Sequence, residues 1–80
     1  MNLFKTEITY RDGQKVQFWL TYESQRAVAG GFGPGVRAIS VTTYSVPMFG
    51  AATANDKPTT IDMDKIGSVR GVSSRSVKVR

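Results

Sequence analysis

The sequence predicts a small all-β domain over residues 1–80, with five mostly antiparallel strands and at most one short helical turn. Three observations indicate this class. Apolar and polar side chains alternate on both sides of an Asp12-Gly13 turn within residues 3–22, which is typical of a β-hairpin. β-Branched residues and Tyr dominate residues 36–46, as a pleated strand prefers. Only residues 23–29 lack strand alternation and suit a helical turn.

The first element is the hairpin. Successive side chains of a strand point to opposite faces, so each arm has one apolar face and one polar face. The residues expected on the apolar faces are Phe4, Ile8 and Tyr10 in the first arm, and Val16, Phe18, Leu20 and Tyr22 in the second. A two-stranded ribbon is marginal alone in water, so later elements must cover this face.

A helical turn and a glycine-rich connection follow. Residues 23–29 are expected to form one or two helical turns, or a broad loop, with Ser24 as the N-cap and Gly30-Gly31 ending them. No Lys-Ser/Thr and no helix start follow the glycine-rich residues 30–35, so they match neither a P-loop nor a dinucleotide fingerprint. We expect a flexible or bent connection, with Phe32 either packed down or exposed as a contact residue.

Three more strands are expected in the second half. Residues 36–46 exceed the usual strand length, which predicts a bend, a bulge or a switch between sheets in their Ser/Thr-rich middle. Residues 48–58 are expected to be a loop, and residues 59–63 a short strand. After a turn, Gly71 is expected to interrupt the run, and residues 75–80 to form the last strand. Such strands most economically close into a small SH3-like or OB-like barrel, or form a strongly coiled sheet.

Composition argues against an enzyme. The chain has no cysteine and no histidine, which excludes disulfides, thiolate metal sites and a Ser-His or Cys-His nucleophile. Among six carboxylates, only Asp62 and Asp64 lie close together in sequence. We expect them to pair with Lys65 or Arg70, or to cap the turn after Asp64, so no metal or other cofactor is predicted.

Charge suggests an anionic partner. Eleven basic and six acidic residues give a formal net charge of +5, which favours nucleic acid first, or an acidic protein surface. The alternative is a charge that serves solubility alone. The N-terminal residues lack the apolar core of a signal peptide, and no apolar stretch approaches the ~20 residues of a membrane span. The sequence therefore predicts a cytoplasmic protein without membrane insertion.

The last sixteen residues carry the candidate nucleic-acid site, because they are basic and hold no acid after Asp64. Lys78 and Arg80 share one strand face, whereas Arg75 has the parity of the inward-facing valines and is expected at the rim. Such cations could neutralise phosphates, or could instead guard a strand edge against aggregation. The predicted nucleic-acid-binding residues are Arg37, Lys65, Arg70, Arg75, Lys78, Arg80 and Trp19.

Exposed aromatics offer a second hypothesis. Trp19 has the opposite parity to Phe18 and Leu20 and is therefore expected on the polar face of the strand. It is a base-stacking platform, an anchor in a protein interface, or a side chain packed under the glycine-rich loop. The packed position is favoured. With Phe32 and Phe49, Trp19 would form a protein-interaction surface. The protein would then be an interaction module or inhibitor, phage or plasmid encoded, that binds a host protein or forms a homo-oligomer.

One segment resembles a known family. Residues 60–70, TIDMDKIGSVR, fit the pattern I-x-x-D-K-I-x-S-V, which is similar to a strand–turn segment of bacterial PH-like domains. Those domains are longer and usually end with a helix, for which no residues remain in this sequence. The resemblance covers eleven of eighty residues and implies no site residue.

Overall fold

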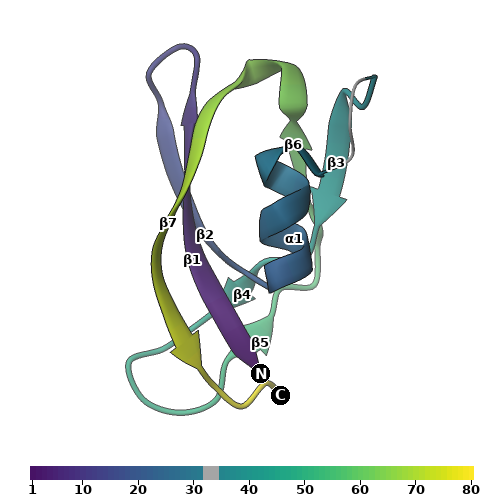
Figure 1. The fold of residues 1–80 in the computed structure, drawn as a ribbon. Coiled ribbons are helices and arrows are strands. Elements are labelled where there is room, and N and C mark those ends of the chain that lie inside the picture. The colour runs from purple at the N-terminus through teal and green to yellow at the C-terminus, as the bar shows by residue number, and fades with distance from the viewer. Residues whose placement is uncertain (32–34) are drawn as a thin grey trace.

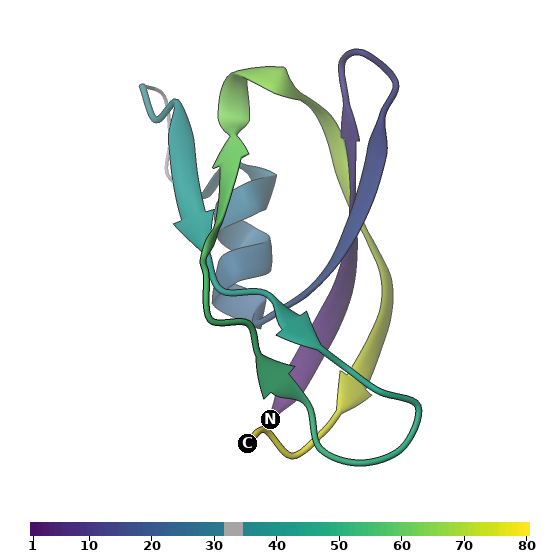
Figure 2. The ribbon, with the colours of Figure 1, turned by 180° about the vertical axis from the view of Figure 1, so that it is seen from behind.

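Two antiparallel sheets enclose a short helical segment in this protein (Figures 1 and 2). The computed structural model describes residues 1–31 and 35–80. The larger sheet has the strand order β5-β4-β2-β1-β7, and the smaller one pairs β3 with β6. The strands are β1 (Asn2–Tyr10), β2 (Lys15–Leu20), β3 (Ala38–Val41), β4 (Tyr44–Ser45), β5 (Thr53–Ala54), β6 (Thr59–Asp62) and β7 (Ile66–Ser76). The predicted predominance of antiparallel strands is confirmed.

The predicted hairpin is present as β1 and β2. Gly13 has φ 93°, a left-handed conformation that glycine adopts readily. The Asp12 carboxylate accepts a hydrogen bond from the Gln14 N–H at 2.9 Å, and the Tyr10 N–H donates to the Gln14 carbonyl at 2.8 Å. This local turn sets the register, in which Ile8 lies opposite Val16.

The helical segment is longer than the sequence predicted. It comprises α1 (Tyr22–Arg26) and the wider π-type segment η1 (Ala27–Gly31), in which Gly30 has φ 102°. The expectation that Ser24 caps it was wrong, because the Thr21 hydroxyl accepts the hydrogen bond from the Ser24 N–H at 3.3 Å. Tyr22 is consequently in the first helical turn and is 53% exposed, instead of facing the core from a strand.

The main core lies where the helical segment packs between the two sheets. Val28 of η1 is 1% exposed and belongs to a buried cluster with Ile8, Leu20, Val41 and Ile61. Partly buried side chains surround this cluster: Tyr10, Val16, Phe18, Ile39, Met63, Ile66 and Val69. The apolar face of the hairpin is therefore covered by later elements, as its amphipathic pattern required.

The long β-rich stretch of residues 36–46 divides between the two sheets. It forms β3 in the smaller sheet and β4 in the larger one, so of the predicted bend, bulge or switch in its Ser/Thr-rich middle, the switch is the one observed. Thr43 at the switch is 5% exposed, and its hydroxyl accepts a 2.7 Å hydrogen bond from the Asn55 amide. Asn55 follows β5, a two-residue strand inside what the sequence predicted to be loop only.

Strand β7 differs most from its prediction. It runs unbroken through Gly71, ends at Ser76, and leaves residues 77–80 as a tail, so the expected break and the expected final strand over residues 75–80 were wrong. The pairing with β1 shifts twice, between Lys5 and Thr6 and between Thr9 and Tyr10. Gly67 and Gly71 lie at these shifts, as glycines often do at β-bulges.

No closed barrel forms over residues 1–31 and 35–80, because these strands make two separate sheets. One parallel bridge between Ala52 and Val79 joins the segment before β5 to the tail after β7, which brings the two edges of the larger sheet together at one end. The two chain ends and β5 lie at that end, opposite the hairpin turn (Figure 1). In the described part of the chain, no helix is long and apolar enough to serve as a membrane span.

Candidate functional site

The predicted basic residues do not gather on one surface. Arg70 and Arg75 lie on β7, opposite Glu7 and Leu3 of β1. Directly paired residues share a face, and Glu7 and Leu3 have the opposite parity to the core residue Ile8. Both arginines therefore extend from the face of the larger sheet that is turned away from the main core, which we call the outer face.

The other predicted cations lie toward the two ends of the molecule, which measures 37 × 21 × 19 Å. Arg37 precedes β3, where its carbonyl accepts a 2.7 Å hydrogen bond from the Met63 N–H. Lys65 ends η2 (Met63–Lys65), the 3₁₀ turn between β6 and β7. Lys78 and Arg80 belong to the tail at the opposite end, beside β5 (Figure 1).

Two of the predicted phosphate-binding residues are already ion-paired. Arg70 Nε is 3.2 Å from Glu7 Oε1, and Lys65 Nζ is 3.9 Å from Asp62 Oδ2. The Glu7 side chain is only 11% exposed, and a hydrogen bond from Gln17 followed by the charge of Arg70 holds its pKa below the ordinary value. Each pair gives these cations a carboxylate that competes with a polyanion, although the Arg70 and Lys65 side chains are 71% and 75% exposed.

Arg75 has a different environment. Its guanidinium donates hydrogen bonds to the Pro47 carbonyl at 3.1 Å and to the Met48 carbonyl at 2.9 Å. The loop between β4 and β5 is thereby fastened to β7, some 27 residues further along the chain. Arg75 thus holds this loop in place. The sequence analysis placed Arg75 at the rim of the last strand and did not predict this contact.

That loop and the tail together form a surface without acidic side chains. We call residues 46–52 and 77–80 the terminal surface. The Ala52 N–H donates to the Lys78 carbonyl at 2.7 Å, and the Arg80 N–H donates to the Ala52 carbonyl at 2.9 Å. No residue of the two segments is acidic, and neither Lys78 nor Arg80 has an ion pair within the described chain.

A hollow of about 460 Å³ opens on the terminal surface, lined by Ser45, Val46, Pro47, Phe49, Gly50, Ala51, Thr53 and Arg80. Phe49 is 86% exposed and Met48 is 77% exposed. An aromatic residue, an arginine and two hydroxyl-bearing residues therefore line one concavity, with no acidic side chain among its described lining residues. The sequence analysis singled out Phe49 and Arg80 separately but missed Met48. Met48 could have been found as a second large apolar residue next to Phe49 in a loop.

The two other predicted aromatics differ from Phe49. Trp19 is half-buried and lies opposite Tyr44 of β4 on one side and Lys5 of β1 on the other. It thus lies on the outer face, within the paired part of the sheet. Phe32 falls outside the described residues, as does half of the glycine-rich stretch predicted to cover Trp19.

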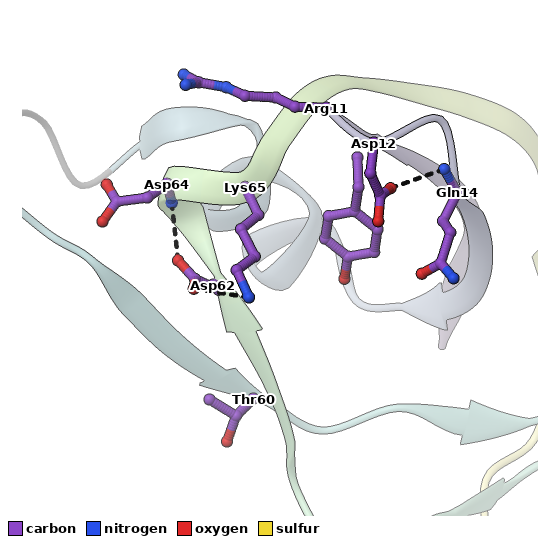
Figure 3. Close-up of a pocket in the computed structure, with 8 residues that line it drawn as sticks. Arg11, Asp12, Gln14, Thr60, Asp62, Asp64 and Lys65 are labelled. Carbon is purple, nitrogen blue, oxygen red and sulfur yellow. Dashed lines mark hydrogen bonds and ion pairs between the residues drawn. The ribbon is translucent and has the colours of Figure 1, made fainter.

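A second hollow of about 480 Å³ lies at the opposite end, between the hairpin turn and η2 (Figure 3). Its charged lining is mixed, because Arg11 and Lys65 stand among Asp12, Asp62 and Asp64. Asp62 accepts a 3.0 Å hydrogen bond from the Asp64 N–H and pairs with Lys65, as predicted for this acidic pair. The described residues contain no group of three or more side chains suited to hold a metal ion.

Comparisons with known proteins do not identify a family. No family model matches this chain, and no curated protein or solved structure is significantly similar to it.

Proposed function

We propose that this protein binds nucleic acid through the terminal surface. The observation that carries the proposal is the hollow lined by both Arg80 and the exposed Phe49, which has no acidic side chain among its described lining residues. The net charge of +5 supports it, because a basic protein attracts a polyanion over long range. The tail contributes Lys78 as a second cation beside Arg80.

The chemistry of this surface suits backbone contacts better than sequence reading. Lys78 and Arg80 are suited to neutralise phosphates, and the Thr53 hydroxyl is suited to a phosphate or sugar oxygen. The Ser45 hydroxyl already donates to Asn55 Oδ1 at 2.9 Å. Reading of base edges needs side chains that enter a groove in a fixed geometry, and this surface presents a shallow hollow on a loop and a tail. We therefore expect affinity that depends weakly on sequence and strongly on salt.

Fluorescence anisotropy tests the proposal directly. Labelled single-stranded and double-stranded oligonucleotides are titrated with the protein at 50 and 200 mM salt. Binding at low salt that weakens with salt supports the proposal, and the K78Q/R80Q double variant should lower the salt slope by about 1.4 to 1.8 units, since each lost phosphate contact removes ~0.7–0.9. R11Q is the matched control, because Arg11 lies in the hairpin turn at the other end. Absence of binding at 50 mM salt would refute the proposal.

A protein-interaction role is the second candidate. It is favoured by the adjacent side chains of Met48 and Phe49, which are 77% and 86% exposed, since exposed apolar clusters mark interaction sites. Self-association would then use this loop, and an acidic protein surface would suit the neighbouring Arg80. Static light scattering of the unmodified protein and of F49S tests self-association. A dimer that F49S converts to a monomer supports this role.

A further inference from the structure

The loop that carries Phe49 is exposed at its tip and held at its base. Arg75 binds the carbonyls of Pro47 and Met48, Gly50 turns the chain with φ 98°, and Ala52 is hydrogen-bonded to the tail on both sides. Ala52 itself is fully buried. The ring of Phe49 is therefore presented by an anchored backbone, and a group that is already positioned loses less entropy on binding.

Phe49 contributes little to the packing of this fold. At 86% exposure it leaves nearly all of its ring in water, and it is not among the side chains that pack on the main core. Phe49 and Arg80 line the same hollow. A ligand that satisfies both must offer a flat, polarisable face next to an anionic group.

An unpaired nucleotide has this combination, because its base has a free face and the sugar joins that base to an anionic phosphate. In a duplex both faces of each base are stacked on neighbours, and exposing one costs unstacking energy. We infer, on the basis of the proposed nucleic-acid function, that the Arg75-anchored loop stacks Phe49 on an unpaired base, so that single-stranded nucleic acid is the preferred ligand. Stacking on an aromatic side chain is tolerant of sequence, in agreement with the absence of a groove-reading element on this surface.

Arg75 acts in this scheme as a positioning residue. Two of its five guanidinium N–H donors are engaged with loop carbonyls, so its loss should change the position of Phe49. The sequence assigned it to phosphate contact together with Lys78 and Arg80. The two roles differ in their salt dependence, because only a phosphate contact releases counterions.

The test compares binding of a labelled twelve-nucleotide deoxythymidine strand with binding of the same strand hybridised to deoxyadenosine. F49L, which keeps an apolar side chain but removes the ring, should weaken single-strand binding roughly five- to hundredfold. F49W should retain or improve it, and neither variant should change duplex binding. Because Phe49 is so exposed, both variants should fold, which circular dichroism and the urea midpoint verify.

R75Q should weaken single-strand binding as F49L does, while the slope of log affinity against log salt stays unchanged. K78Q should instead lower that slope by about 0.7. R75Q combined with F49L should bind no more weakly than F49L alone, because both act through one contact. A slope that falls by about 0.7 in R75Q would make Arg75 a phosphate contact and overturn its positioning role.

The failures of the two proposals are distinguishable. If the unmodified protein binds neither oligonucleotide at low salt, the nucleic-acid function fails and the stacking inference fails with it. If it binds both equally, or the duplex more tightly, and F49L has no effect, only the stacking inference is overturned. Binding to vesicles of phosphatidylglycerol and phosphatidylcholine that F49L abolishes, without any oligonucleotide binding, would assign the loop to an anionic lipid surface and overturn both.

Discussion

Arg70 Nε lies 3.2 Å from Glu7 Oε1, although the two residues are 63 positions apart in the chain. They face each other across β1 and β7, and Gln17 on β2 donates to the other carboxylate oxygen at 3.0 Å. One carboxylate thereby links the neighbouring strands β2, β1 and β7 on the outer face of the larger sheet. The hydrogen bond from Gln17 is the main reason for the lowered pKa of Glu7, and the charge of Arg70 adds to it.

This pKa shift predicts a pH dependence of stability. Because the folded-state pKa of Glu7 lies below its ordinary value of 4.5, the ionised form favours folding. Its stabilising contribution is complete above pH 4.5 and is lost as the pH falls through the folded-state pKa. The difference in unfolding free energy between the unmodified protein and E7Q should therefore shrink on acidification. Urea denaturation at a series of pH values measures it, and a difference that is independent of pH would contradict the role given to Glu7.

The helix cap gives a second prediction. Replacing Thr21 by Ala removes the oxygen that accepts the Ser24 N–H, and loss of such a cap costs about 1 kcal/mol. Ser24, the cap that the sequence suggested, is the control: S24A removes only a hydroxyl that hydrogen-bonds to Thr21 and should cost less. T21S should retain most of the stability. Urea midpoints of the three variants check the order, and a larger loss in S24A than in T21A would argue against the observed cap.

The elements predicted correctly are those whose determinants are local in sequence. Asp12-Gly13 folds the hairpin through contacts within five residues of chain, and the Ser/Thr-rich run in residues 36–46 marks the switch between sheets. Strand β7 could not be predicted in this way. Gly67 and Gly71 weaken its local strand signal, whereas its pairing comes from β1, more than fifty residues earlier.

The candidate site was predictable in composition and not in arrangement. Basic side chains near the C-terminus and the exposed Phe49 are visible in the sequence. That Arg70 pairs with Glu7 and that Arg75 reaches Met48 depends on which strands become neighbours, and the amphipathic pattern carries no information on strand order. The terminal surface therefore emerges only once β5 and the tail meet at Ala52.

The two bulge glycines should respond differently to substitution by alanine. A Cβ on Gly67 would lie 3.0 Å from the Thr9 carbonyl oxygen, which is part of the backbone and cannot easily move. A Cβ on Gly71 would meet only the Gln25 side-chain amide at 3.4 Å. G67A should therefore destabilise the protein by about 1–3 kcal/mol. G71A should be close to neutral. The small cost of the contact with Gln25 is offset because alanine lowers the conformational entropy of the unfolded chain. Equal losses in thermal or urea unfolding would contradict the bulge at Gly67.

Thr6 and Gln25 should be energetically coupled. Thr6 is fully buried on the core-facing side of β1, its hydroxyl donates to the Phe4 carbonyl at 3.2 Å, and it accepts from the Gln25 amide of α1 at 3.1 Å. T6V keeps the shape and removes both hydrogen bonds, so it should cost about 1 kcal/mol. In a double-mutant cycle of T6V and Q25A, the coupling free energy from urea unfolding should be at least ~0.5 kcal/mol. The exposed Thr60, whose hydroxyl meets only Ser40, provides the control T60V with little loss. Strictly additive effects of T6V and Q25A would show that α1 is held to the sheet by apolar packing alone.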